Sequence, residues 1–449
     1  MASTKLSRTA GTPTSSKKFT ISYWVKRSNL GSAGGAAGHI FDTYVDGTNR
    51  SQIGFDDDFI DFRLQVSGSN TGRLLTNRKF RDSSAWYHIV AAVDTTLSTA
   101  DDRVKLYVNG VQETSFSNRI NPSVNADFPM GGTHTIGAYG GGTNYYDGLL
   151  SHFHFTDGYV YPASTFGSTD STSGIWKPNT SPSVTYGTNG FFLKFENSSA
   201  MGTDSSGQSN TFTVSGSLTQ TVDSPDNNFA TFNANYKSLN QPTYTQGNLT
   251  VTSSGNEYRL SFSSIANSTG KWYAEFKRVV GTTDEVFLGV SSENDVNNYF
   301  PITNEYLGAS SKSVGITSGN GKYYISSSAT TYAASYTAGD IIGIALDLTN
   351  KKLYASKNGA WSTGSGAWGS TTFNASTGAI DISSIIASGE FGFLGCSNSG
   401  TSTFTANFGN GYFGTTAVSS AGNNASGNGI FEYDTPTGYT ALSTKGLNL

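Results

Sequence analysis

Short strand-like segments recur along the whole sequence, about every 8 to 15 residues, and this recurrence constrains the fold more than any other feature. Each segment alternates apolar with polar residues or is apolar throughout. In the first half the segments are residues 19–25, 39–44, 51–55, 59–66, 86–93, 104–108, 134–138, 149–156 and 191–195. In the second half they are residues 258–262, 272–277, 286–290, 313–316, 322–326, 341–347, 352–356, 391–395 and 404–408. Because no helical pattern alternates with them, the sequence predicts an all-β fold.

Turn-forming dipeptides separate several of these segments. Asn or Asp precedes glycine at Asp46-Gly47, Asn109-Gly110, Asp157-Gly158 and Asn189-Gly190. Such pairs tolerate the positive φ angles of tight hairpin turns. The stretch VKLYVNGV (residues 104–111) is therefore predicted to form a β-hairpin.

Length and composition indicate two domains. The 449 residues include 53 Gly, 24 Tyr and 28 Phe, and 13% of the residues are charged. Aromatic residues suit β structure, and a chain of this length commonly forms two domains of roughly 200 residues. The strand pattern weakens at residues 204–242, which are rich in Ser, Asn, Asp and Pro. We therefore expect one domain at residues 1–203, an ordered connector at 204–242 and a different domain at 243–449.

The charge distribution argues against nucleic-acid binding. The net charge is −4, and the densest basic run is Arg73, Arg78, Lys79 and Arg81. Phosphate binding needs a concentrated basic face, so we interpret this run as a solvated hairpin.

Cysteine usage and hydropathy exclude other classes. The single Cys396 lies in an apolar run and is predicted to be a buried, inert thiol. Residues 1–18 lack the apolar core of a secretory signal, and no apolar run reaches transmembrane length. We therefore expect neither a signal peptide nor membrane insertion.

Four ordered motifs in the first half resemble the laminin-G/concanavalin-A-like jelly-roll superfamily. They are TISYWVKR (residues 20–27), WYHIVAAVD (86–94), VKLYVNGV (104–111) and DGLLSHFHFTDG (147–158). The resemblance covers about residues 1–200 and implies an antiparallel β-sandwich.

The second half resembles the SPRY (B30.2-like) β-sandwich. Its motifs are GKWYAEFK (residues 270–277), FLGV (287–290), GDIIGIALDLTNKKLYASKNGAW (339–361) and ANFG (406–409). The long third motif predicts a buried strand, a turn at Thr349-Asn350, a return strand and a turn at Asn358-Gly359. Together the two resemblances imply two tandem antiparallel β-sandwiches.

The order of these modules resembles structural proteins of tailed bacteriophages. They are joined by DSPDNNFATFN (residues 223–233) and followed by PTGYTALSTKGLNL (436–449). The resemblance implies a tail-fibre, tail-accessory or capsid-decoration protein on the virion surface, assembled in the host cytoplasm. Its implied partners are other virion proteins, further copies of itself, and a glycan or protein of the host surface.

Catalysis is not predicted. Sandwiches of the first type include glycoside hydrolases, which need two carboxylates flanking the sugar bond, often in the motif Glu-x-Asp-x-x-Glu. None of the nine Glu residues has this arrangement. Glu293 and Asp295 begin the pattern, but Asn298 occupies its last position. We therefore assign no catalytic residues and expect the protein not to be an enzyme.

The histidines are interpreted as outward-facing or hydrogen-bonded core residues. They are His39, His88, His134, His152 and His154. His152 and His154 would share one face of a strand, but no Cys or Glu nearby in sequence supplies a third metal ligand.

Calcium is the more credible ion, because jelly rolls of the superfamily that the first half resembles often hold it at a loop rim. Asp56, Asp57 and Asp58 concentrate three carboxylates in one turn, and Asp94 follows a strand. Such oxygen ligands suit calcium, but a solvated acidic hairpin is the favoured interpretation of this turn.

Ligand binding is expected on loops at the ends of the sandwiches. In the first domain the loop at residues 139–148 offers Tyr139, Asn144, Tyr145 and Tyr146 beside three consecutive glycines. Aromatic rings stack on sugars and amides bond their hydroxyls. The alternative is that this loop packs on its own domain.

In the second domain two segments place aromatics between polar residues. They contain Asn298, Tyr299 and Tyr306, and Trp361 and Trp368, respectively. Trp361 belongs to the SPRY-like motif and is expected to be partly structural. Burial of these aromatics at a virion interface explains them equally well.

The leading hypothesis is a virion protein that attaches to the host through many weak contacts. A non-viral soluble lectin or adaptor is the alternative, and a polysaccharide-cleaving enzyme is a third possibility.

Overall fold

The computed structural model describes residues 4–28, 30, 38–236, 238–281 and 286–448. The first three residues of the amino-terminal stretch, for which no signal was predicted, lie outside the described residues. The chain divides into two compact units, Met1–Gln220 (unit 1) and Thr221–Leu449 (unit 2). This division falls inside the expected connector, residues 204–242.

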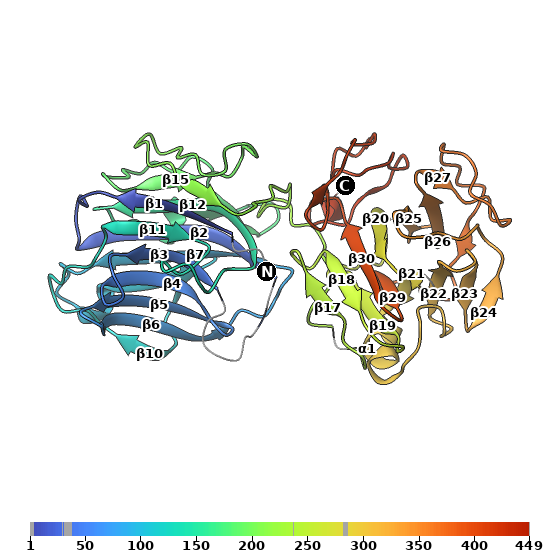
Figure 1. Cartoon of the computed structure of the whole chain (residues 1–449), viewed down its shortest axis with the longest axis horizontal. Helices are drawn as coiled ribbons and strands as arrows, with labels where there is room; N and C mark the ends of the chain where they lie inside the picture. The colour runs from blue at the N-terminus through green and yellow to red at the C-terminus, as the bar shows by residue number, and fades with distance from the viewer. Residues whose placement is uncertain (1–3, 29, 31–37, 237, 282–285, 449) are drawn as a thin grey trace. The chain divides into compact units, whose positions relative to one another are not determined.

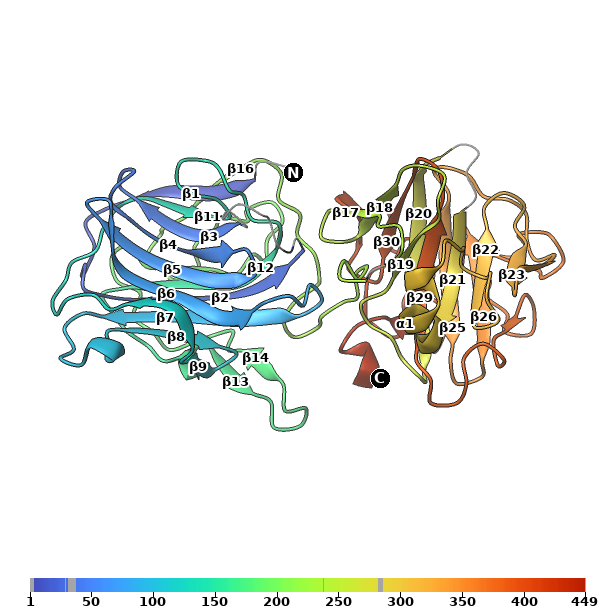
Figure 2. The same cartoon turned by 90° about the horizontal axis from the view of Figure 1, so that it is seen from below.

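Unit 1 is an antiparallel β-sandwich of two large sheets (Figures 1 and 2). In spatial order the eight-stranded sheet contains β10 (Phe116–Ile120), β6 (Ser69–Lys79), β5 (Phe59–Val66), β4 (Arg50–Asp56), β3 (His39–Tyr44), β11 (Gly132–Ile136), β1 (Lys5–Ala10) and β16 (Thr213–Ser215). The six-stranded sheet contains β15 (Phe191–Leu193), β12 (Gly148–Asp157), β2 (Lys18–Arg27), β7 (Trp86–Asp94), β8 (Val104–Val108) and β9 (Val111–Glu113). A short hairpin, β13 (Gly167–Thr169) and β14 (Trp176–Pro178), and two 3-10 turns, η1 (Ala100–Asp102) and η2 (Ala163–Thr165), complete the unit.

The core of unit 1 lies between these two sheets. Alternate residues of a strand face opposite sides of a sheet, so Phe41 of β3, Ile53 of β4 and Phe62 of β5 point into the core. Their neighbours in sequence therefore point to the other side of the eight-stranded sheet, which we call its outer face.

Unit 2 is a second β-sandwich. Its nine-stranded sheet contains β17 (Thr243–Thr245), β18 (Thr250–Ser253), β30 (Ser402–Asn407), β20 (Lys271–Val280), β25 (Ile341–Asp347), β26 (Lys352–Lys357) and β27 (Ala360–Trp361), with β28 (Ile380–Asp381) on β26 and the parallel strand β33 (Thr440–Ala441) on β20. Its six-stranded sheet contains β19 (Arg259–Phe262), β29 (Gly392–Asn398), β21 (Val286–Ser292), β22 (Ser313–Thr317), β23 (Tyr323–Ile325) and β24 (Ser328–Thr330). The hairpin of β31 (Tyr412–Phe413) and β32 (Thr416–Ala417), the helix α1 (Glu293–Asn298) and the 3-10 turns η3 (Phe300–Ile302) and η4 (Gly446–Asn448) lie outside these sheets.

The carboxyl-terminal segment covers the outer face of the nine-stranded sheet. Phe431 and Tyr439 pack with Tyr273 of β20 and Tyr354 of β26 in a cluster separate from the main core. Both faces of this sheet are therefore buried along β20.

The predicted all-β, tandem-sandwich fold is confirmed. The turns at Asn109-Gly110 and Asn358-Gly359 connect paired strands, and all four residues have positive φ angles of 48–82°. Other details differ from expectation. The strand predicted at 134–138 ends at Ile136, because Gly137 turns away with φ 83°. The helix α1 replaces a predicted loop, and its Ser292 caps the Asp295 N–H.

The basic run lies along and just after the second strand of the β5–β6 hairpin, and Arg78, Lys79 and Arg81 are exposed, as the solvated-hairpin interpretation predicted. Arg73 and Arg78 lie in β6, where Arg73 pairs with Asp61 and Arg78 pairs with Glu113. Arg81 pairs with Asp58, and Lys79 lies over the ring of Phe59. These basic side chains are therefore neutralised or packed within unit 1.

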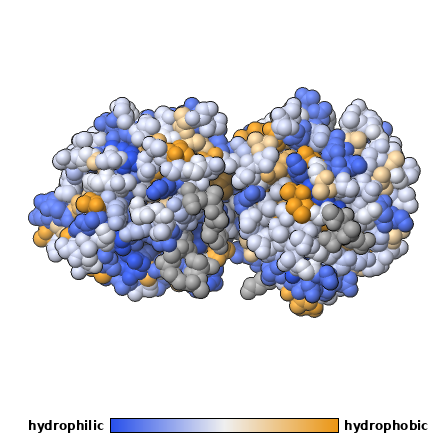
Figure 3. All heavy atoms as spheres, viewed as in Figure 1, coloured by the Kyte–Doolittle hydropathy of each residue, from blue (hydrophilic) through white to orange (hydrophobic). Residues whose placement is uncertain are grey.

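The surface is largely polar or neutral. In the view of Figure 3 the hydrophobic residues form small, scattered patches. Among the described residues, no helix has the length and apolar character needed to cross a membrane.

Candidate ligand-binding site

The glycine loop of unit 1 (residues 137–147) packs against the outer face of the eight-stranded sheet. The Tyr139 hydroxyl hydrogen-bonds to the Arg50 guanidinium. Its ring meets those of His39 and Tyr44 edge-on, with centroids 5.4 and 5.6 Å apart. Tyr139 therefore anchors the loop to strands β3 and β4.

The other predicted residues of this loop differ in their roles. Tyr146 donates a hydrogen bond from its hydroxyl to the Lys26 carbonyl oxygen at 2.6 Å and stacks near Phe55. Tyr146 is therefore structural, as the alternative interpretation proposed. Asn144 is exposed and Tyr145 is half-buried, so these two remain available for a ligand.

A row of polar residues crosses the outer face beside this loop. Strand pairing sets its members directly opposite one another on six adjacent strands. This polar row consists of Ser7 (β1), Thr135 (β11), Asp42 (β3), Gln52 (β4), Arg63 (β5) and Arg73 (β6). With about 4.8 Å between strands, the row spans roughly 24 Å.

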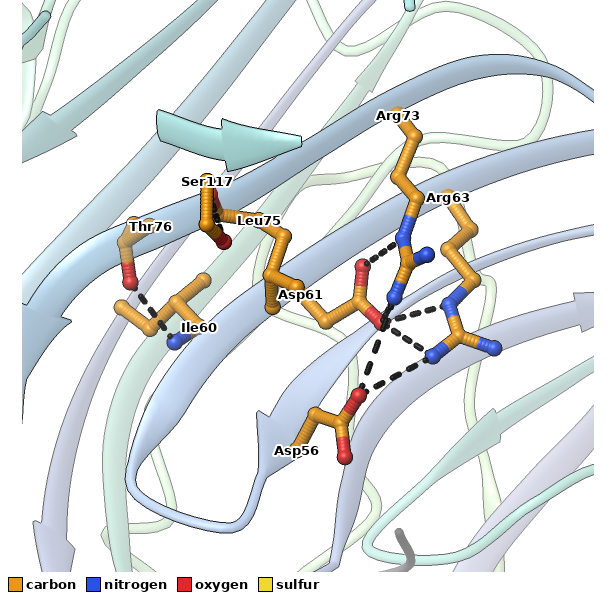
Figure 4. A network of polar contacts seen from close by, with 8 residues as sticks. All are labelled: Asp56, Ile60, Asp61, Arg63, Arg73, Leu75, Thr76 and Ser117. Carbon is orange, nitrogen blue, oxygen red and sulfur yellow. Dashed lines mark hydrogen bonds and ion pairs between the residues drawn. The ribbon is translucent and has the colours of Figure 1, made fainter. Parts of the chain in front are cut away.

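Two arginines and two aspartates form a charged network at one end of the row (Figure 4). Arg73 binds Asp61 with two hydrogen bonds of 2.9 and 2.8 Å, and Arg63 binds the same carboxylate. Asp56 lies 3.3 Å from Arg63 and 3.7 Å from Arg73. The two positive and two negative charges balance, so this end of the row has no net charge.

The middle of the row contains buried oxygen atoms without hydrogen-bond partners. Among the described residues, none bonds to Asp42 Oδ1, Gln52 Oε1 or Thr135 Oγ1. The other carboxylate oxygen, Asp42 Oδ2, accepts a 2.9 Å hydrogen bond from the Gly140 N–H. Burying a polar atom without a bond is unfavourable, so these positions suit water or a ligand hydroxyl.

Burial also changes the titration of the groups at this position. Burial raises the pKa of Asp42 to about 6, although the Gly140 N–H and Arg50 act in the opposite direction. Burial and the charges of Arg50 and Arg63 lower the pKa of His39 to about 4. His39 is therefore neutral at pH 7, whereas Asp42 titrates in the mildly acidic range.

Arginines pair with two of the three carboxylates in the acidic turn that was considered for calcium. Asp56 pairs with Arg63, and Asp58 pairs with Arg81 at 2.6 Å and with buried Arg27 at 3.3 Å. Arg27 also donates to the Asp57 carbonyl oxygen at 2.8 Å. Within the part of the chain that the structure describes, no group of three or more His, Cys, Asp or Glu side chains could hold a metal ion.

Asp94 is likewise engaged within its own unit. One oxygen pairs with Lys18 at 3.0 Å, and the other accepts hydrogen bonds from the Thr96 N–H and hydroxyl. These contacts fix the end of β7.

Both histidines of β12 lie beside the ring of Phe192, as predicted for residues that share a strand face. The register shifts between Ser151 and His154, and His152 has a positive φ of 45°. His154 stacks on Phe192 with centroids 3.9 Å apart, and its Nδ1 bonds the Tyr186 hydroxyl.

The predicted residues of the first unit 2 segment occupy a helix and the turn after it. Asn298 is exposed on α1 and donates to the Asn294 side chain at 3.1 Å. Tyr299 packs edge-on to Phe300, whereas Tyr306 stacks on Phe287 of β21. Tyr299 and Tyr306 both contact the aromatic cluster on the six-stranded sheet.

The two predicted tryptophans lie near β27. Trp361 is buried with Tyr273 and Phe373, so its role is structural. Trp368 is half-buried against the main core of unit 2. These tryptophans and Tyr306 belong to different aromatic clusters, so the structure does not join the predicted residues of unit 2 into one site.

The sequence analysis missed the residues of the polar row. The alternation in β3, β4 and β5 places Asp42, Gln52 and Arg63 on one face, and that signal is present in the sequence. Their alignment depends on the register between strands, which no local pattern specifies.

A comparison with protein families matches most of unit 1. Residues 3–164 match the family model Laminin_G_3, described as the concanavalin A-like lectin/glucanases superfamily. A search of curated proteins found no match.

Two human SPRY domains are among the similar solved structures. The SPRY domain of HERC1 is 15% identical, with 39% of this chain and 96% of that chain covered and a TM-score of 0.29. Another human SPRY domain is 16% identical, with 35% and 90% covered and a TM-score of 0.25. The sandwich fold of unit 2 is established by its own sheets. The chain thus combines two β-sandwiches, and the first is similar to the concanavalin A-like lectin/glucanases superfamily over residues 3–164.

Proposed function

We propose that this chain is a non-catalytic bacteriophage virion protein that attaches to the host surface by binding a neutral glycan along the polar row of unit 1. The observation that carries the binding role is the set of buried oxygens on Asp42, Gln52 and Thr135 that have no hydrogen-bond partner among the described residues. The virion role is supported by the resemblance of the module order to tailed-phage structural proteins. Calcium at the acidic turn is not part of this proposal, because arginines already pair with Asp56 and Asp58.

The chemistry of the row favours a neutral polyhydroxylated ligand. Carboxylate, amide and guanidinium groups offer paired acceptors and donors that match neighbouring sugar hydroxyls. The arginines at the exposed end already face Asp56 and Asp61, so they provide little net attraction for an anion. Many copies on one particle would convert weak individual contacts into firm attachment.

The carboxylates on this face do not favour hydrolysis. Asp42 and Asp61 lie on strands β3 and β5, with β4 between them. Two guanidinium groups engage Asp61, which leaves it poorly placed to activate a water molecule or attack a sugar. We therefore propose binding without cleavage.

Binding is tested with the purified full-length chain on an array of neutral and anionic oligosaccharides. Gln52→Ala is expected to weaken binding to a neutral hit by roughly 5- to 30-fold, the effect of losing one or two hydrogen bonds. Lys105→Ala, which removes a charge from the other sheet, is the matched control and should leave binding unchanged. Equal binding by Gln52→Ala, or hits confined to anionic glycans, would contradict the proposed site.

Reducing-end release from the bound glycan separates binding from cleavage. We expect none; release that Asp42→Asn abolishes would support the polysaccharide-cleaving alternative. Mass spectrometry of purified phage particles tests the virion role. Binding without any particle association would instead favour a non-viral lectin or adaptor.

A further inference from the structure

Unit 2 contains an aromatic cluster that includes the half-buried ring of Tyr306. This ring stacks on Phe287 with centroids 4.4 Å apart and an interplanar angle of 20°. Phe287 is 1% exposed, whereas Tyr306 is half-buried. Tyr306 therefore covers Phe287 on the outer side of the six-stranded sheet.

Two further tyrosines stand beside this stack. The Tyr324 centroid is 5.5 Å from Phe287 and 5.8 Å from Tyr306. The Tyr258 centroid is 6.1 Å from Phe287 and 5.3 Å from Tyr306. Because each is almost equally distant from both stacked rings, both lie along the side of the stack. Neither covers the face of Tyr306 that points away from Phe287.

The rim of this aromatic surface is polar. The Asn304 side-chain oxygen accepts hydrogen bonds from the Tyr258 N–H and from Asn240, which fixes its amide beside the cluster. Asn320 lies 3.5 Å from the Tyr324 hydroxyl. Glu305 adjoins Tyr306 in sequence and disfavours an anionic ligand here.

We propose that the open face of Tyr306 stacks against one pyranose ring of a neutral saccharide, forming a second binding site independent of the polar row. A pyranose has an apolar C–H face of about the size of one tyrosine ring and hydroxyls at its edge. The amides of Asn304 and Asn320 contact Tyr258 and Tyr324 at the border of the cluster and would serve as hydrogen-bond partners for such hydroxyls. A saccharide fits a flat ring with an amide rim better than a proline-rich peptide, which needs a groove between rings.

The site is tested by fluorine NMR on the full chain labelled with 3-fluorotyrosine. The Tyr306 resonance is assigned by its absence from Tyr306→Phe. Maltohexaose and cellohexaose are the probes, and a proline decamer and phosphocholine are the competing ligands. We expect at least one hexasaccharide to shift the Tyr306 resonance, and Gln52→Ala to leave this shift unchanged.

Titration calorimetry with the active hexasaccharide measures the role of the ring. Tyr306→Ala should weaken this site roughly tenfold, while Tyr306→Phe and the surface control Tyr159→Ala should bind as the unmodified chain does. The NMR shift is observed on the unmodified chain, so misfolding of the alanine variant cannot mimic the result. No shift with either hexasaccharide, or a shift only with the proline decamer or phosphocholine, would overturn the proposal.

Discussion

Two buried carboxylates, one in each unit, show how structural and ligand-facing polar groups differ. Glu275 of β20 accepts hydrogen bonds from the backbone N–H groups of Glu432 and Tyr433 at 2.8 and 2.9 Å. Tyr273 and Asn407 donate further bonds to its two oxygens. Asp42 of β3 is equally buried, but one of its oxygens has no partner among the described residues.

The difference lies in what covers each sheet. The carboxyl-terminal segment brings backbone donors to Glu275 and completes its hydrogen bonds within the protein. The glycine loop brings one donor, Gly140, to Asp42. Burial raises the pKa of both groups, to about 7 for Glu275 and about 6 for Asp42, so burial alone does not distinguish them. The two carboxylates differ instead in their hydrogen bonds, since one oxygen of Asp42 has no partner among the described residues.

The largest expected change in stability comes from removing the Glu275 carboxylate, whose hydrogen bonds are all made within the protein. Glu275→Ala leaves the backbone N–H groups of Glu432 and Tyr433 without their acceptor and should lower the free energy of unfolding by roughly 3–5 kcal/mol. Denaturant unfolding measures the loss. Glu432→Ala, which removes a carboxylate bonded at the surface to Ser419, is the control and should change stability by about 0.5 kcal/mol or less. Similar losses in the free energy of unfolding for Glu275→Ala and Glu432→Ala would show that the buried hydrogen bonds of Glu275 do not stabilise unit 2.

Neutralising Asp42, which lacks one hydrogen bond, should instead raise the free energy of unfolding. The folded-state pKa of Asp42 is raised to about 6 from 3.8, so its protonated form is favoured by folding and that stability is lost as pH rises through 6. Asp42→Asn should therefore stabilise the chain at pH 8, by roughly 1–3 kcal/mol, and have little effect at pH 3.5.

Unfolding of the two proteins at both pH values checks this expectation. The difference between them isolates Asp42 from His39, whose lowered pKa contributes with the opposite sign in the same range. A destabilised asparagine variant at pH 8 would show that the ionised carboxylate is well satisfied.

The smallest effect is expected at the acidic turn. Although partial burial opposes the shift, Arg81 and Arg27 lower the pKa of Asp58. With arginines as counter-charges, addition of EDTA should leave the melting temperature unchanged within error. A fall of several degrees that calcium reverses would show that the turn binds the ion.

Local patterns in the sequence predict much of this fold. Strands β3, β5, β8 and β25 match their predicted ranges, because alternation and the Asn-Gly turns are local signals. Helix α1 escaped prediction, since six residues are too short for a clear periodicity, although Ser292 and Asp295 provide a capping signal.

The site was less predictable because it depends on pairing between distant strands. Aromatic loop residues were expected to bind ligand, but Tyr146 and Trp361 pack within their own units. Asp42, Gln52 and Arg63 were not singled out, since their alignment requires the register of three strands. Polar residues that alternate with core residues in successive strands are therefore the sequence signal that indicates a site of this kind.

The central claim is tested most directly by the crystal structure of the chain with a neutral oligosaccharide selected on the array. We predict sugar hydroxyls within hydrogen-bonding distance of Asp42 Oδ1, Gln52 Oε1 and Thr135 Oγ1. A saccharide bound elsewhere in unit 1, with these three oxygens bonded only to water in the complex, would contradict the claim.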